Sequence, residues 1–158
     1  MQNSDRIVGG EAAPSMIPWQ VALLSGNFQF CGATILDAST LLCAAHCTPQ
    51  TSHSIRVGST SKTSGGQTRG IAQVIYNNNP GFQYNSNTLN NDFVILKLDS
   101  PLTLNDEVQP ACLPSSSSYL GVSSTEESCY TSGWGTLSSG SYDSQNLYCT
   151  RLEISWEI

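Results

Sequence analysis

The segment Leu42-Cys43-Ala44-Ala45-His46-Cys47 gives the first indication of how the chain is built. It begins as an apolar, strand-like run and ends with a histidine beside a cysteine. A lone histidine in such a place is more commonly a satisfied core residue, but Cys31 stands sixteen positions before Cys47, in Phe30-Cys31-Gly32-Ala33. A bridge between these cysteines would close a short loop and hold the strand end that presents His46. In the loop-entropy model it would contribute about 3 kcal/mol.

Short apolar runs of this kind recur along the chain, separated by Gly, Ser, Asn and Pro, which is typical of β-strands joined by turns. The expected strands are Gln20–Leu24, Phe28–Leu36, Thr40–Ala45, Ile55–Val57, Thr68–Tyr76, Phe93–Leu98, Cys129–Trp134 and Tyr148–Ile154. Six precede residue 100 and two follow Cys112, with Pro101–Ser128 as a connector. The layout predicts a bipartite all-β protein, a barrel or a sandwich.

Composition narrows the possible functions. The chain has 158 residues, 39% of them hydrophobic and 11% charged, with a net charge of −6, so it has enough apolar material for a globular core. Its six Lys and Arg residues are scattered singly, which argues against nucleic-acid and anionic-membrane binding. No apolar run approaches the length of a transmembrane span.

Six cysteines favour an oxidising, extracellular compartment, whereas the polar start Met1–Arg6 lacks the apolar core of a signal peptide. An incomplete N-terminus would reconcile the two signals. A metal site would have to enlist Cys31, Cys43, His46 and Cys47, which offer one C-x₃-C spacing, from Cys43 to Cys47, but not the paired C-x₂₋₄-C motifs of structural zinc sites. We therefore expect neither a metal nor a cofactor.

Three further segments have an ordinary interpretation when each is taken alone. Asn91-Asp92 precedes an apolar strand and could be a turn. Arg6-Ile7-Val8-Gly9-Gly10 could be a flexible leader, and Ser132-Gly133-Trp134-Gly135 could be a tight turn with a buried indole.

Together and in this order, the segments resemble the chymotrypsin/trypsin family of serine proteases. The matching motifs are the activation site at Arg6-Ile7-Val8-Gly9-Gly10, Pro18-Trp19-Gln20-Val21, Ala44-Ala45-His46-Cys47, Asn91-Asp92 with its strand, Gln109-Pro110-Ala111-Cys112-Leu113-Pro114, and Ser132-Gly133-Trp134-Gly135. The resemblance covers Ile7 to about Ile154. It implies a trypsin-like antiparallel double β-barrel, with the first barrel complete to about residue 110 and the second only begun over 111–158. Residues 1–6 would be an activation-peptide remnant and 7–158 a partial peptidase domain.

The resemblance also implies site residues and partners. His46 would be the general base of a Ser-His-Asp triad, and Asp92 would orient its ring. An activating protease would cleave after Arg6 and free the Ile7 amine, which in the family pairs with an aspartate beside the nucleophile. The substrates would be proteins or peptides, and the protein would be secreted.

The chain departs from the family pattern because Gly-Asp-Ser-Gly-Gly is absent. The nucleophile, the oxyanion-hole amides, the aspartate for Ile7 and the specificity pocket are missing with it. We therefore expect the 158 residues alone to be inactive, as a truncated protease. The alternative is a non-catalytic isoform or an interaction protein built on the protease scaffold.

The resemblance gives each cysteine a different expectation. Cys31–Cys47 is the one expected bridge, and Cys43 replaces a small hydroxyl residue as a buried free thiol. Cys129 matches a cysteine whose partner lies beyond Ile158, Cys149 one whose partner position holds Ala13, and Cys112 one that bridges elsewhere. Some relatives bind calcium in the loop matching Gly58–Gln73, but this stretch has no Asp or Glu, so none is expected. His53 lies in a polar loop and matches no family role.

Overall fold

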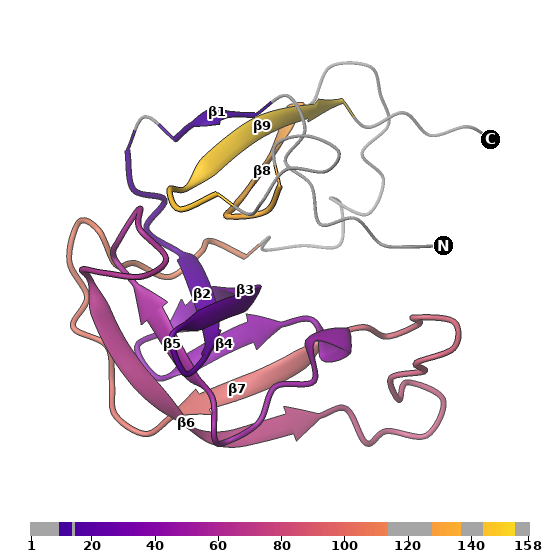
Figure 1. The fold of residues 1–158 in the computed structure, drawn as a ribbon. Helices are drawn as coiled ribbons and strands as arrows, with labels where there is room; N and C mark the ends of the chain where they lie inside the picture. The colour runs from indigo at the N-terminus through magenta and orange to yellow at the C-terminus, as the bar shows by residue number, and fades with distance from the viewer. Residues whose placement is uncertain (1–9, 14, 114–127, 137–143, 154–158) are drawn as a thin grey trace.

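A closed six-stranded antiparallel barrel forms the larger part of the molecule (Figure 1). The structure is a computed structural model that describes residues 10–13, 15–113, 128–136 and 144–153. Around the barrel the strands follow the order β2-β3-β4-β7-β6-β5. Their bounds are β2 Gln20–Ser25, β3 Phe28–Asp37, β4 Thr40–Cys43, β5 Ser54–Val57, β6 Gln67–Tyr76 and β7 Val94–Leu98. One short 3₁₀ helix, η1 (Ala45–Cys47), follows β4.

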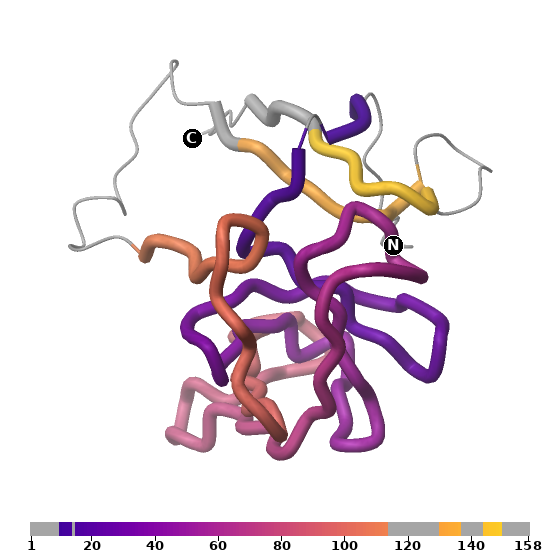
Figure 2. The backbone as a smooth tube through the Cα atoms, turned by 90° about the vertical axis from the view of Figure 1, so that its left-hand side faces the viewer, coloured from indigo at the N-terminus to yellow at the C-terminus, as the bar shows by residue number. Residues whose placement is uncertain are grey.

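A smaller three-stranded sheet lies beside the barrel, in the order β1-β9-β8 (Figures 1 and 2). Its strands are β1 Glu11–Ala12, β8 Ser128–Gly133 and β9 Tyr148–Glu153. The expected fold class is confirmed, since the molecule is almost wholly β, with a complete first barrel and a second sheet that is only begun. None of the helical structure in the described residues is long and apolar enough to cross a bilayer.

The barrel core follows from the alternation of side chains along its strands. In β7, Val94, Leu96 and Leu98 are buried, while Ile95 and Lys97 between them are only partly buried. The other strands contribute inward residues of the same apolar kind. The buried cluster includes Val21, Leu23, Ala33, Ile35, Leu41, Cys43, Ile55, Val57, Ile71, Val94, Leu96 and Leu98.

Strand β2 is buried on both faces and joins the two parts of the molecule. Val21 and Leu23 point into the barrel core, whereas Ala22 and Leu24 pack in a second cluster with Trp134 and Leu147. The Trp134 indole is 2% exposed, and its Nε1–H donates to the carbonyl oxygen of Thr60 at 2.7 Å. The second sheet is therefore fixed to the outside of the barrel through apolar packing and a buried hydrogen bond.

Two local features differ from the sequence-based expectation. The strand expected over Thr40–Ala45 ends at Cys43, because Ala45–Cys47 turn into η1 and Thr48 takes a left-handed conformation with φ 45°. Strand β1 was not expected at all. It consists of two residues that pair with β9, Glu11 with Cys149 and Ala12 with Tyr148, so only a long-range contact defines it.

The two buried clusters predict separable effects of core mutations. Leu147→Ala should speed amide hydrogen exchange in β8 and β9 and leave the barrel protected, because Leu147 packs only in the cluster outside the barrel. Leu23→Ala should speed exchange in the barrel and lower the free energy of unfolding by about 2–5 kcal/mol, as leucine truncations in cores do. Equal deprotection of both sheets by Leu147→Ala would contradict this description.

Candidate active site

The pairing of β4 with β7 brings His46 and Asp92 together although they lie 46 positions apart. The two strands are antiparallel, and their last pair at this edge is Cys43 with Val94. Beyond this pair, β4 runs on into Ala44 and η1, which carries His46, while the chain that enters β7 carries Asp92. Because the end of one antiparallel strand meets the start of the other, both side chains lie at the same rim of the barrel.

Two tight turns shape this rim. Ala44 is extended, with φ −74° and ψ 138°, and η1 ends where the Thr48 N–H donates to the carbonyl oxygen of Ala45 at 3.0 Å. On the other side, Asn91 has φ 56° and its carbonyl oxygen accepts from the Phe93 N–H at 2.8 Å. Asparagine tolerates this left-handed conformation better than most residues, which explains its place directly before Asp92.

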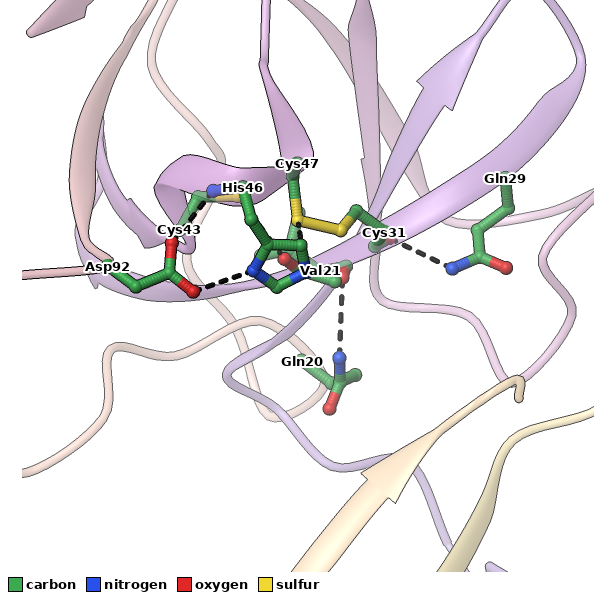
Figure 3. The surroundings of a disulfide bond; sticks show 9 residues. Gln20, Val21, Gln29, Cys31, Cys43, His46, Cys47 and Asp92 are labelled. Carbon is green, nitrogen blue, oxygen red and sulfur yellow. Dashed lines mark hydrogen bonds and ion pairs between the residues drawn. A yellow bond between two sulfur atoms is a disulfide. The ribbon is translucent and has the colours of Figure 1, made fainter. Parts of the chain in front are cut away.

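The Asp92 carboxylate holds both the backbone and the ring of His46 (Figure 3). Its Oδ1 accepts from the His46 backbone N–H at 2.7 Å, and its Oδ2 lies 2.7 Å from Nδ1 of the ring. Burial acts to raise the pKa of Asp92, but the hydrogen bonds from the ring and backbone of His46 outweigh it and hold this pKa below its ordinary value. The ionised carboxylate favours a proton on Nδ1, which leaves the lone pair of Nε2 free in the neutral ring.

A disulfide between Cys31 and Cys47 lies on the other side of the ring (Figure 3). The Cα atoms are 6.2 Å apart, and Sγ of Cys47 lies 3.9 Å from Nε2 of His46. The bridge expected from the family resemblance is therefore present. It ties β3 to the end of η1 and restrains the turn that carries His46.

Cys43 is buried and unpaired, as expected. Its thiol lies in contact with β3, where it donates to the carbonyl oxygen of Gly32 at 3.4 Å. Burial raises the pKa of Cys43 to about 11, and the negative charge of Asp92 acts in the same direction. The thiol therefore stays protonated at neutral pH and is a poor nucleophile.

The His46 ring borders a cavity of about 430 Å³ between β3 and β8. Phe28 and Phe30 line it from β3, and the segment 131–135 lines it from the second sheet. Gln20 spans the two sides, because its Oε1 accepts from the Ser132 hydroxyl at 2.6 Å. Sequence reasoning missed this pair: each residue belongs to a family motif, but no local pattern links positions so far apart.

The remaining candidate residues do not belong to the arrangement of His46, Asp92 and the disulfide. Arg6 and Ile7 lie outside the described residues, as does the side chain of Cys129. Cys112 is exposed and Cys149 half-buried, and both are free thiols. His53 packs edge-on against Phe30, with ring centroids 4.8 Å apart, and its Nδ1 accepts from the Gln50 N–H at 3.1 Å.

Comparison with known proteins identifies the group to which this arrangement belongs. Residues 7–155 match the family model described as Trypsin. The chain belongs to the trypsin family. Trypsin I-P1 of Gallus gallus is 38% identical over 158 residues, covering 97% of this chain and 59% of the relative. Trypsin delta of Drosophila melanogaster is 38% identical over 144 residues, covering 89% and 53%.

A solved structure agrees with the trypsin-family assignment. Neuropsin, a serine protease expressed in the limbic system of mouse brain, superimposes with a TM-score of 0.78 at 30% identity. The match covers 92% of this chain and 63% of neuropsin. The chain thus spans between about half and two thirds of the length of these trypsin-family relatives.

The Asp92–His46 contact predicts a pH-dependent component of stability. Because the pKa of Asp92 is lowered by folding, this component is present above the ordinary aspartate pKa of about 4 and is lost as the pH falls through the folded value. Asp92→Asn should therefore be less stable than the parent at pH 7, and the difference should shrink below about pH 4. Urea unfolding followed by circular dichroism checks this. Asp106→Asn, in an exposed turn, controls for the loss of one negative charge, and a pH-independent difference at Asp92 would contradict the argument.

The environment of Cys43 predicts selective thiol reactivity. In the native chain at pH 8, iodoacetamide should alkylate the exposed Cys112 and leave Cys43 unmodified, because Cys43 is both buried and protonated. Peptide mass mapping measures both sites, and unfolding in urea should make Cys43 react. Native alkylation of Cys43 as fast as that of Cys112 would show that the thiol is accessible.

Proposed function

We propose that this trypsin-family chain contributes the general base and the orienting carboxylate of a serine-type endopeptidase. His46 acts as the base and Asp92 orients it. The observation that carries the proposal is the double contact of the Asp92 carboxylate, with the ring Nδ1 and with the His46 backbone N–H. This contact fixes the tautomer and the position of the ring, which are the two properties that a general base needs.

The proposed reaction follows the mechanism established for Ser-His-Asp hydrolases. Nε2 of His46 takes the proton of a serine hydroxyl as its oxygen attacks the peptide carbonyl carbon, and then gives that proton to the leaving amine. Asp92 remains ionised and stabilises the imidazolium that forms. The cavity of about 430 Å³ beside Nε2 offers room for substrate next to the ring.

The nucleophile is the missing part of this proposal. The 158 residues contain no Gly-Asp-Ser-Gly-Gly segment, which in the family also supplies the oxyanion-hole amides. One such hydrogen-bond donor is worth about 2.7–4 kcal/mol in subtilisin. We therefore propose that a polypeptide of these 158 residues alone has no triad-type activity.

Activation and location belong to the same proposal. Cleavage after Arg6 by another protease would free the Ile7 amine, and the target of that amine would lie in the segment that holds the nucleophile. The Cys31–Cys47 disulfide supports secretion, because such bonds persist in oxidising compartments. The substrates would be proteins or peptides.

A non-catalytic role is the second candidate. A truncated isoform or an interaction protein would use the same barrel without chemistry. It differs from the first candidate in one testable respect, since it requires that no product of the transcript contain the serine segment.

A fluorophosphonate probe tests the proposal. The purified 158-residue chain, cleaved after Arg6, should show no serine labelling and no peptide hydrolysis. A product of the same transcript read beyond the codon for Ile158 should carry the serine motif and hydrolyse peptides. In that product His46→Ala should lower kcat by about 10⁴-fold or more, as loss of the base does in related triads. His53→Gln is the matched control and should keep full activity.

Labelling with turnover by the 158 residues alone would overturn this account, since it would mean that another serine reaches His46. A transcript that ends at Ile158 would favour the non-catalytic role.

A further inference from the structure

Three groups that can bind a soft metal ion lie close together at the rim of the barrel that carries His46. Sγ of Cys31, Sγ of Cys47 and a ring nitrogen of His46 all lie within 4.8 Å of one another. In the oxidised chain the two sulfurs are bonded to each other and cannot act as thiolate ligands. Figure 3 shows the ring between this disulfide and Asp92.

We propose that reduction of the Cys31–Cys47 disulfide creates a zinc site formed by both thiolates and Nε2 of His46. While the disulfide is intact, it prevents metal binding at this site, which includes the proposed general base. The metal binding stands on geometry alone, and only its effect on catalysis rests on the proposed function.

The geometry requires small movements. Zn–S bonds of about 2.3 Å and a Zn–N bond of about 2.0–2.1 Å at tetrahedral angles place the two sulfurs about 3.8 Å apart, and each sulfur about 3.6 Å from the nitrogen. Sγ of Cys47 is already 3.9 Å from Nε2. Once the S–S bond is broken, the sulfurs need to separate by less than about 2 Å. Side-chain rotation can supply this, because the two Cα atoms are 6.2 Å apart.

Asp92 completes the environment that a metal-binding histidine usually has. A histidine ligand commonly gives its second N–H to a carboxylate, which fixes the ring and strengthens the ligand nitrogen. Here Nδ1 lies 2.7 Å from Oδ2 of Asp92, which leaves Nε2 free on the side of the sulfurs. His46 and Cys47 border the cavity of about 430 Å³, which provides a path of entry and room for a water as fourth ligand.

The nearby Cys43 is not a ligand in this proposal. Its thiol is buried, donates to the carbonyl oxygen of Gly32 on β3, and has a pKa raised by burial to about 11. Metal binding requires a thiolate, so the buried and protonated Cys43 is a poor donor.

A phosphine can supply the two electrons that reduce the disulfide. The phosphine and one water convert the disulfide into two thiols, and the phosphorus leaves as phosphine oxide. Zn²⁺ then displaces one proton from each thiol and binds the lone pair of Nε2. That lone pair is the one that would take the serine proton, so a metal-bound chain has no general base.

The test uses the full 158-residue chain with Cys43, Cys112, Cys129 and Cys149 replaced by serine, so that the only thiols are Cys31 and Cys47. Co²⁺ serves as the spectroscopic probe, and Zn²⁺ is then added in competition. After phosphine reduction, one Co²⁺ should bind with a thiolate charge-transfer band, and Zn²⁺ should displace it. The oxidised chain should show no such band.

Substitutions distinguish metal binding by the two thiolates and His46 together from metal binding by the two thiolates alone. Asp92→Asn should weaken Zn²⁺ binding by about 10–100-fold, as loss of a carboxylate behind a ligand histidine does, and His46→Gln, which removes the ligand itself, should weaken it at least as much. His53→Gln should leave the affinity unchanged, since His53 is engaged with Gln50 and Phe30.

Near-UV circular dichroism is recorded on every sample to report the packing of the reduced chain. Equal affinity in the parent and His46→Gln would overturn the proposal, and so would absence of the band. A reduced chain that loses its near-UV signal without regaining it on Zn²⁺ addition would overturn it as well. None of these failures would bear on the proteolytic role, which the fluorophosphonate experiment tests separately.

Discussion

The antiparallel pairing of β4 with β7 is the constraint on which the candidate site depends. It sets Cys43 opposite Val94 and so fixes where the chain leaves one strand and enters the other. Asp92 can then hold the backbone N–H and the ring of the same histidine, at 2.7 Å in each case. A slip of one residue would reverse the faces of Val94, Leu96 and Leu98, so core burial and site geometry are secured by one register.

The rest of the molecule supports this rim from two directions. The disulfide ties η1 to β3 and restrains the backbone around His46. Strand β2 carries apolar residues on both faces, so the outer sheet with Trp134 packs against the same wall of the barrel that holds β3. The cavity beside the histidine is therefore bounded by both sheets, and its Gln20–Ser132 hydrogen bond joins them.

Local pattern and family motifs predicted much of this from the sequence. All eight expected strands are present, and the Ala44–Cys47 and Asn91–Asp92 segments indicated the site. Strand β1 and the Gln20–Ser132 hydrogen bond could not be predicted from the sequence, because each is defined only by contact with residues far away along the chain. The end of β4 was misplaced by two residues, since Ala44 and Ala45 suit a strand locally, whereas Ala44 stays extended outside the strand and η1 begins at Ala45. The family roles of Arg6 and Ile7 remain predictions.

The central claim is that Asp92 holds the His46 ring with a proton on Nδ1 and a free lone pair on Nε2. Nitrogen-15 NMR of the imidazole rings measures this directly at a pH where His46 is neutral. The account predicts that His46 is in the Nδ1–H tautomer, and that Asp92→Asn removes this preference while the spectrum of His53 is unchanged. A neutral His46 ring that is protonated on Nε2 in the parent chain would contradict the account.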